Sequence, residues 1–387
     1  MAAFTLRPLS MAIAISALTA ATAGHAAFKM GDTDVGFTGY IKLDAMVTTT
    51  SDGQIATGIG RDFYVPSLTP VGGGNESPVF DMHARQSRFA LTTDTPLDNG
   101  QKVSGRFEFD LMSTTIGDQR ITNGYAPEIR HAFITYGNWT MGQTWSTFMD
   151  TNALPDSLDF IGGTDGAVFV RQGLVRYTSG NWQFAVENPE TTVTNFGGAT
   201  RAVTDDNGVP DLVARYNHKA GWGAMSVAVL ARELSMESGK TNDQVFGYGV
   251  SVSGKSNVTP NDELRFTVNV GSGLGRYMSL NTANDAAVSS KGELEAIDSQ
   301  GLMLAWKHSW SSQWRSSLIL AQQAIDNPVA WTGKAQTSAT HSVSANLIKQ
   351  LANKLSAGVE IRHAVRELES GAQGELLRVQ STVKYDF

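Results

Sequence analysis

The chain contains no cysteine among its 387 residues, so no disulfide holds its fold together. Beyond the first residues it also lacks any run of about 18 apolar residues, which excludes a helical membrane span. Its 30 basic residues are outnumbered by 37 acidic ones and form no basic run. That balance argues against a nucleic-acid partner.

The first 26 residues have the layout of a secretory signal peptide. A single charge, Arg7, precedes the apolar segment 11–23, and Gly24 and Ala26 supply the small residues of a cleavage site. The alternative, a membrane anchor, needs a longer apolar segment. Removing residues 1–26 takes away Arg7 and leaves 29 basic and 37 acidic groups, a net charge of −8. We therefore expect an exported mature chain, 27–387.

What the chain does contain is apolar alternation with period two, over segments longer than the five or six residues of a usual strand. In one such segment, Leu264, Phe266 and Val268 alternate with polar residues that include Arg265. Helical periodicity is nearly absent. Sixteen strands are predicted, at 34–49, 81–93, 101–113, 128–136, 139–146, 168–178, 181–187, 210–218, 222–233, 243–254, 261–272, 297–310, 312–324, 338–350, 354–366 and 374–387.

The connections between these segments alternate between long and short. The long connections 50–80, 114–127 and 147–167 are separated by the short connections 94–100 and 137–138, and the rhythm continues to the end. An outer-membrane barrel needs this pattern, and its sheet must close because an open edge leaves backbone groups unpaired in hydrocarbon. The sequence thus predicts an all-β fold: a single 16-stranded antiparallel transmembrane β-barrel with long extracellular loops and short periplasmic turns, in the outer membrane of a Gram-negative bacterium.

Two other kinds of protein were weighed. A soluble β-sandwich would bury one face of sixteen strands yet would not produce the alternating connections. An outer-membrane enzyme would need a serine and a histidine that meet on one barrel face, whereas the six histidines after residue 26 lie singly on different predicted strands. The stretch GVSVSGKS (249–256) matches a phosphate-binding loop but no helix follows it, so Lys255 is interpreted as a turn residue. No catalytic activity and no cofactor are expected.

The polar face of the strands predicts a wet channel, because a sixteen-stranded barrel is too wide for side chains to fill. The basic side chains expected to line it are Lys42, Arg106, Arg265, Arg362 and Arg378. The connection 147–167 is expected to fold into this channel as a constriction loop, the alternatives being an exposed acidic loop or a calcium site. Its acids are Asp150, Asp156, Asp159 and Asp165, and Arg171 and Arg176 on the next strand would face them and set a transverse field.

Several stretches resemble the DcaP-type porins, which are outer-membrane channels named for dicarboxylic acid uptake. They are GFTGYIKLDAM (36–46), SRFALTTDTPLDNGQKVSGRFEFD (87–110), IRHAFITYGNWTMGQTWSTFMDTNALPDSLDFIGG (129–163) and RQGLVRYTSGNWQFAVENPET (171–191). The resemblance implies a sixteen-stranded barrel, usually a homotrimer, that favours small anionic solutes such as dicarboxylates. The chain departs from members that carry a helical extension before the barrel, so its trimer is expected to form through barrel-wall contacts. A general, non-selective porin and a plugged structural barrel remain the alternatives.

The segment 374–387 predicts the closing strand. Its apolar row ends in Tyr385 and Phe387, which we expect in the aromatic girdle at the periplasmic edge, against the lipid. In barrels of this kind a final aromatic residue resembles the signal that the barrel assembly machinery recognises. We therefore expect the pair to act in assembly rather than in transport.

Overall fold

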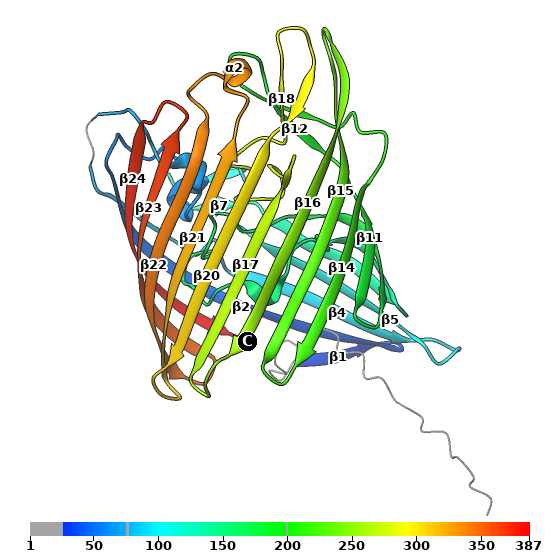
Figure 1. Cartoon of the computed structure of the whole chain (residues 1–387). Coiled ribbons are helices and arrows are strands. Elements are labelled where there is room, and N and C mark those ends of the chain that lie inside the picture. The colour runs from blue at the N-terminus through cyan, green and yellow to red at the C-terminus, as the bar shows by residue number, and fades with distance from the viewer. Residues whose placement is uncertain (1–25, 75–76, 199) are drawn as a thin grey trace, which may run out of the picture.

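The protein forms one closed β-barrel whose strands tilt steeply around the wall (Figure 1). The computed structural model describes residues 26–74, 77–198 and 200–387. Nearly all of the expected signal peptide, 1–26, lies outside the described residues, so that prediction stays a prediction. Each of the strands that form the barrel wall pairs antiparallel with the next of them along the chain, and β24 pairs with β2 to close the ring. The prediction of a 16-stranded barrel is confirmed.

The barrel strands lie close to the predicted segments because alternation sets both their type and their extent. They are β2 (Thr33–Thr50), β4 (Arg88–Pro96), β5 (Lys102–Asp110), β8 (Glu128–Tyr136), β9 (Trp139–Trp145), β10 (Arg171–Ser179), β11 (Trp182–Glu187), β14 (Asp211–Ala220), β15 (Gly223–Ser238), β16 (Thr241–Asn257), β17 (Asp262–Ser272), β20 (Asp298–Ser309), β21 (Trp314–Asp326), β22 (Thr337–Ala352), β23 (Leu355–Leu368) and β24 (Gln373–Asp386).

The remaining elements belong to the long connections and to the strand edges. They are β1 (Ala26–Met30), β3 (Val79–His83), β6 (Gly117–Asp118), β7 (Gly124–Tyr125), β12 (Thr191–Thr194), β13 (Arg201–Thr204), β18 (Ala286–Val288), β19 (Leu294–Ala296) and the short helices α1 (Ile59–Asp62), η1 (Pro66–Leu68), η2 (Thr151–Ala153) and α2 (Val329–Thr332). In the described part of the chain, no helix has the length and apolar character to cross a membrane.

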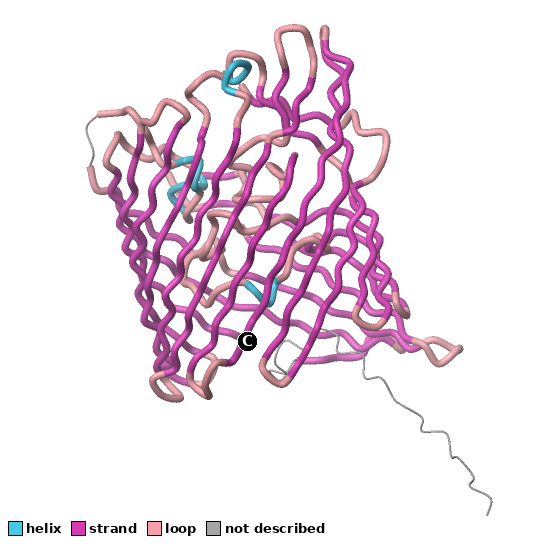
Figure 2. The backbone as a smooth tube through the Cα atoms, viewed as in Figure 1, coloured by secondary structure: helices cyan, strands magenta, loops and turns pink. Residues whose placement is uncertain are grey.

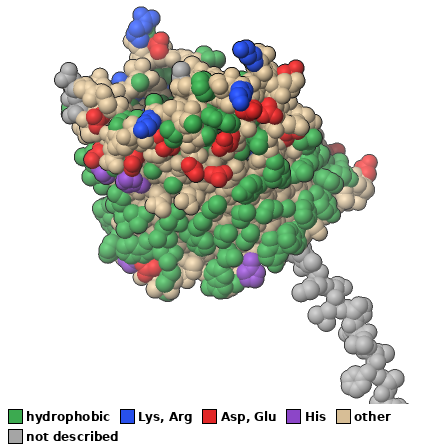
Figure 3. Space-filling view, turned by 45° about the horizontal axis from the view of Figure 1, so that its top comes forward, with side chains coloured by type: hydrophobic (Ala, Val, Ile, Leu, Met, Phe, Trp, Pro, Cys, Tyr) green, Lys and Arg blue, Asp and Glu red, His purple; other side chains and the backbone are tan. Residues whose placement is uncertain are grey.

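The alternation separates two faces of the wall. On β21, Leu318 and Leu320 are 40% and 46% exposed on the outer face. The alternate residues Ser317 and Ile319 are buried on the inner face. On the face shown in Figure 3, hydrophobic side chains form a belt around the wall, and charged side chains gather above it toward the long loops. A charged residue on the apolar outer face costs roughly 2 to 4 kcal/mol at mid-height. The outer face therefore matches a hydrocarbon surrounding.

Two local predictions need correction. The segment 81–93 is not one strand, because residues 84–87 separate β3 from β4, and both halves pair with β2. Lys255 is not a turn residue: it lies within β16, pairs in register with Arg265 and forms an ion pair with Glu263 at 2.6 Å. Continuing alternation through GVSVSGKS had already argued against a phosphate-binding loop.

The seam between β2 and β24 extends past the last strand residue. The backbone N–H of Phe387 donates to the carbonyl of Gly39 at 3.1 Å. Its ring stacks against Phe37 at 5.6 Å and packs against Phe89 at 5.9 Å between ring centroids. Phe387 thus joins three strands at the short-turn end of the seam.

Deleting Phe387 is expected to lower the amount of folded protein in the outer membrane, because the three-ring cluster and the last seam hydrogen bond are lost together. Conductance of the channels that do insert should not change. Immunoblots of outer-membrane fractions, with gels run before and after boiling, measure the folded fraction. Phe387→Tyr retains the ring and should behave as wild type, while normal levels of the deletion variant would refute the assembly role of Phe387.

Candidate functional site

The connection between β9 and β10, residues 146–170, runs inside the barrel and is called the inner loop from here on. Figure 2 shows loop segments and a short helix within the ring of strands. The loop lies along the wall and is held by side chains from eight strands, β14, β16, β17, β21, β22, β23, β24 and β2 in turn: Arg215, Ser253, Arg265, Arg315, Asn346, Glu360, Gln380 and Lys42. The inner loop therefore contacts inward-facing side chains of eight barrel strands, and the constriction of a passage by residues 147–167 stays a prediction.

Ion pairs fasten the first half of the inner loop. Asp150 accepts from Arg215 at 2.9 Å, and Asp156 accepts from Arg315 at 2.6 Å. Asp150 also caps the short helix η2, because its carboxylate accepts from the backbone N–H of Asn152 at 3.0 Å. Each of these carboxylates is therefore neutralised by a wall arginine and is not a free charge in the channel.

The second half of the loop is held by buried carboxylates. Asp159 is 4% exposed and accepts from the backbone N–H of Tyr64 at 2.9 Å. Asp165 is fully buried and accepts from the Tyr64 hydroxyl at 2.9 Å and from Ser342. Burial raises the pKa of the Asp165 carboxyl above its ordinary value, and these donors oppose that rise. Both acids join the inner loop to the first long loop. They do not lie opposite Arg171 and Arg176, so they do not set up the transverse field that the sequence predicted.

Three of the predicted channel-lining residues point inward but are covered. Lys42, Arg362 and Arg378 are 3%, 2% and 2% exposed. The ammonium of Lys42 donates to the carbonyl of Leu158 at 2.6 Å, and Arg378 donates to the carbonyl of Gly60 at 2.6 Å. Because loops lie over them, these residues anchor loops and do not line an open passage, which corrects the expectation from sequence.

Two further predicted arginines also hold the loop while keeping some access to water. Arg176 donates to the Thr147 hydroxyl at 2.8 Å and to the carbonyl of Trp145 at 2.5 Å. Arg265 donates to the carbonyl of Leu154 and to Glu263, the latter at 2.7 Å, and its side chain is 18% exposed. The two residues therefore position the start and the middle of the inner loop.

The last two predicted arginines belong to a separate cluster on the wall formed by β4, β5, β8 and β10. We call it the arginine cluster: Arg88, Arg106, Arg130 and Arg171, with the carboxylates Glu108, Asp110 and Glu128. Arg130 is the best-paired member, at 3.0 Å from Glu108 and 2.8 Å from Asp110. Arg106 pairs with Glu108 and keeps 36% of its side chain exposed.

The cluster has incompletely satisfied donors. The guanidinium of Arg171 lies 4.6 Å from the ring of Trp145, and its contact to Glu128 is long, 3.7 Å. Its Nη1 and the Nε of Arg88 are buried and have no hydrogen-bond partner among the described residues. A buried guanidinium donor without an acceptor is costly, and the cluster holds two such donors.

Arg88 and Arg130 were missed by the sequence reasoning, although both lie in segments quoted for the family resemblance. Arg130 follows Ile129, which is exposed on the outer face, and both Arg130 and its neighbour His131 are buried. The register between β5 and β8 shifts between Glu108 and Phe109. Such a β-bulge lets two successive side chains point to one face, which strict alternation does not predict.

Apolar side chains from several loops close much of the remaining space. Phe63 and Val65 from the first long loop, Met112 from the second and Ile161 from the inner loop form one buried cluster. Phe160, Phe169 and Leu280 pack against it. The loops therefore support one another across the lumen, and the aromatic rings of Phe160 and Phe169 reach Arg130 and Arg171, at 5.4 and 5.8 Å.

The histidines and acidic side chains of the described residues are the groups that would form a serine–histidine pair or a metal site, the two arrangements that sequence motifs can indicate. No histidine there forms a hydrogen bond with a serine: of the two buried histidines, His83 lies 3.2 Å from the carbonyl oxygen of Asp62 and His131 contacts the Thr144 hydroxyl at 3.0 Å. The described residues also contain no group of three or more acidic or histidine side chains placed to hold a metal ion. The chemistry of the lumen is that of paired charges and aromatic rings.

Gly166→Ala is expected to release the end of the inner loop from the wall. Gly166 has φ +73°, and a Cβ there would lie 2.3 Å from the carbonyl oxygen of Gln322 and 2.6 Å from the Cα of Gly301. Single-channel currents in planar bilayers should become larger and noisier. Gly173→Ala is the control, since a Cβ there meets nothing within 4 Å. Equal currents in both variants and the wild type would show that this contact does not hold the loop.

Comparisons with known proteins agree with this geometry. Solved structures of similar fold include the outer membrane channel DcaP of Acinetobacter baumannii, 23% identical, with a TM-score of 0.78, covering 93% of this chain and 99% of that one. An anion-selective porin from Comamonas acidovorans, 12% identical, has a TM-score of 0.54 over 92% of this chain and 100% of that one. The trimer form of OmpT from Vibrio cholerae, 10% identical, has a TM-score of 0.53 over 92% and 100%.

No curated protein matches the chain in a comparison of sequences. The model of the DcaP outer membrane protein family matches residues 9–387, which is nearly the whole chain. The closed 16-stranded barrel and its inner loop agree with this match. The chain belongs to the DcaP outer membrane protein family and is a β-barrel channel of the Gram-negative outer membrane.

Proposed function

We propose that this channel passes small anionic solutes, dicarboxylates among them, by passive diffusion. The observation that carries the proposal is the arginine cluster, in which four guanidinium groups share three carboxylates, a formal charge of +4 − 3 = +1. Planar guanidinium groups match carboxylates in shape and can donate two parallel hydrogen bonds to them. An anion that leaves water at this point meets the Arg106 and Arg88 side chains, which are 36% and 23% exposed.

The aromatic rings beside the cluster support the same proposal. Trp145 and Phe169 flank Arg171, and Tyr40 lies 5.3 Å from the guanidinium of Arg88. Rings of this kind hold guanidinium groups in place through cation–π attraction. They also offer apolar surface to the carbon skeleton of a solute. Passage then follows the concentration gradient, with no cofactor and no energy source in the proposal.

Arg171→Gln is expected to weaken block of the current by phthalate or succinate by about tenfold, because a hydrogen bond to a charged group contributes about 1.5 to 3 kcal/mol. The reversal potential in a salt gradient should move toward cation selectivity. Arg120→Gln is the matched control, because Arg120 is exposed in the second long loop. Cation selectivity of the wild type, without block by either acid, would sink the anion proposal and leave a general porin.

We further propose that the protein assembles as a homotrimer through the wall β4 to β11. The six barrel strands of this wall have only 6 to 9 residues each, whereas the barrel strands from β15 to β24, which leave out β18 and β19, have 11 to 17. A strand that spans hydrocarbon needs about 9 to 11 residues. The short strands have at most that length. The outer face of this wall is therefore better suited to contact a neighbouring subunit than lipid.

A spin label tests the position of the interface, and the absence of native cysteine makes single-cysteine variants simple. A nitroxide at Ile134→Cys on β8 should be shielded from lipid-dissolved oxygen, while one at Leu320→Cys on β21 should be accessible. Both residues are exposed on the outer face of one protomer, at 48% and 46%. Native mass spectrometry should give three copies; equal oxygen accessibility at the two positions would contradict this interface.

A further inference from the structure

A group of aromatic and charged side chains lies on the outer face at the short-turn end of β17, β20, β21 and β22. Outer rows of these strands are marked by exposed leucines, such as Leu304, Leu318 and Leu347 at 42%, 40% and 40%. Every second residue of a strand points to the same face, so the outer rows continue in steps of two toward the short turns. The residues at the ends of these rows are called here the outer aromatic patch: Asp262, Trp306, His308, Trp310, Trp314 and Lys349.

The one carboxylate of the patch is already compensated within it. Asp262 accepts from the indole N–H of Trp306 at 2.9 Å and lies 2.7 Å from Nδ1 of His308. The imidazole of His308 in turn packs edge-on against Trp310, with ring centroids 4.4 Å apart. The negative charge of Asp262 is therefore engaged on the β17 side of the patch.

The one lysine of the patch is not compensated by an acid. Lys349 pairs in register with Trp314, and its ammonium lies 4.9 Å from the ring of Trp314. Among the described residues no carboxylate forms an ion pair with it; its ring contact is the interaction that the structure shows. A cation that snorkels over an aromatic ring at the edge of an apolar wall is suited to a phosphate in the headgroup layer.

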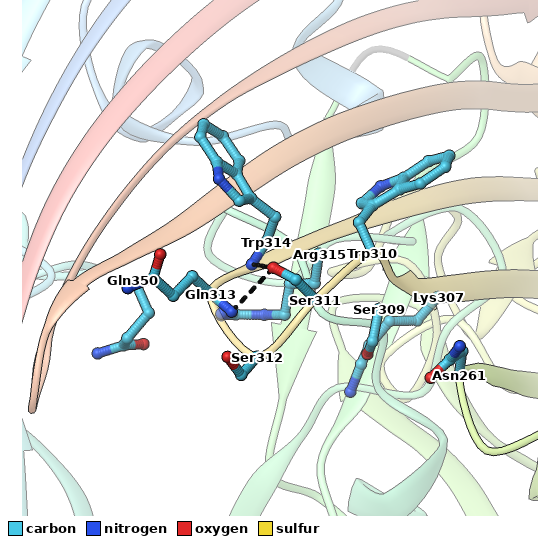
Figure 4. Close-up of a pocket in the computed structure, with 10 residues that line it drawn as sticks. All are labelled: Asn261, Lys307, Ser309, Trp310, Ser311, Ser312, Gln313, Trp314, Arg315 and Gln350. Atoms are coloured by element: carbon cyan, nitrogen blue, oxygen red, sulfur yellow. Dashed lines mark hydrogen bonds between the residues drawn. The ribbon is translucent and has the colours of Figure 1, made fainter.

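A pocket of about 450 Å³ lies at the turn between β20 and β21, and it is lined by Trp310 and Trp314 and also by Lys307 and Arg315. The last two side chains point inward, where Lys307 pairs with Glu263 and Arg315 with Asp156 of the inner loop. The pocket therefore lies toward the inner side of the turn and is not part of the outer aromatic patch. Both indoles point the same way from the turn (Figure 4). Ser311 stiffens this turn, since its hydroxyl accepts from the backbone N–H groups of Gln313 and Trp314, each at 3.2 Å. The turn thus holds the two indoles in place on the outer face.

Lipid rather than a second copy of the chain is the fitting occupant of this wall. β20, β21 and β22 have 12, 13 and 16 residues, long enough to span hydrocarbon. Exposed leucines continue from the patch toward mid-height, where acyl chains lie. We propose that the outer aromatic patch is a binding site for an anionic phospholipid of the periplasmic leaflet, with its phosphate at Lys349 and its acyl chains along the leucine rows.

Native mass spectrometry of the full-length protein, in detergent with equal amounts of phosphatidylglycerol and phosphatidylethanolamine, tests the site. The wild type should retain phosphatidylglycerol preferentially. Lys349→Ala should retain about fivefold less, the equivalent of roughly 1 kcal/mol for one basic residue at a membrane surface. Lys349→Glu should abolish the preference. Gel mobility before and after boiling shows that each barrel is folded.

Lys240→Ala is the matched control, because it removes the same charge from an exposed turn at the opposite end of the barrel. Conductance and block by phthalate should be unchanged in every Lys349 variant, so this test is independent of the proposed transport function. Equal retention of the two lipids by the wild type, or undiminished phosphatidylglycerol retention in Lys349→Glu, would overturn the site. A changed number of subunits in Lys349→Glu would instead make this wall a contact between copies and would also overturn it.

Discussion

Closure of the sheet is the constraint on which the rest of this structure depends. In hydrocarbon no water is present to satisfy a free backbone N–H or carbonyl group, so each strand must have a partner on both sides. The pairing of β24 with β2, from Tyr40 opposite Asp386 to Thr50 opposite Leu376, meets that demand at the seam. Once the ring is closed, alternation sends one row of every strand to lipid and the other to the lumen.

The closed ring creates a second problem, which is how to fill and shape a wide polar interior. The inner loop meets it by lying along the wall, where interior charges such as Arg215, Arg315 and Glu360 hold it. Such buried pairs offset the cost of removing charge from water only where geometry is good and further hydrogen bonds are made. Glu360 fulfils this condition, since it accepts from Ser157, Leu158 and Asn346. The loop is thus a fixed part of the barrel, and the passage is what it leaves free.

How far each feature was predictable follows from the physics that sets it. All the predicted strands but 81–93 lie close to the observed ones because period-two alternation is local, and it also predicted that Lys42 and Arg362 point inward. Their burial was not predictable, because it depends on which distant loop lies above them. The role of Asp150 as a partner of Arg215 has the same origin: 65 residues separate the two. Arg130 was missed because a bulge opposite Glu108 breaks the alternation that predicts which face a side chain takes.

The sequence by itself determined the architecture: a closed barrel with long loops at one end, a lipid-facing apolar row and an inward polar row. These properties follow from near-neighbour patterning, since one residue of shift would reverse every side chain of a strand. Only the tertiary structure decided which inward charges are neutralised by loops and which keep unsatisfied donors. It also decided where short strands gather on one wall. Charge compensation acts between groups a few ångströms apart in space, and chain order does not encode that distance.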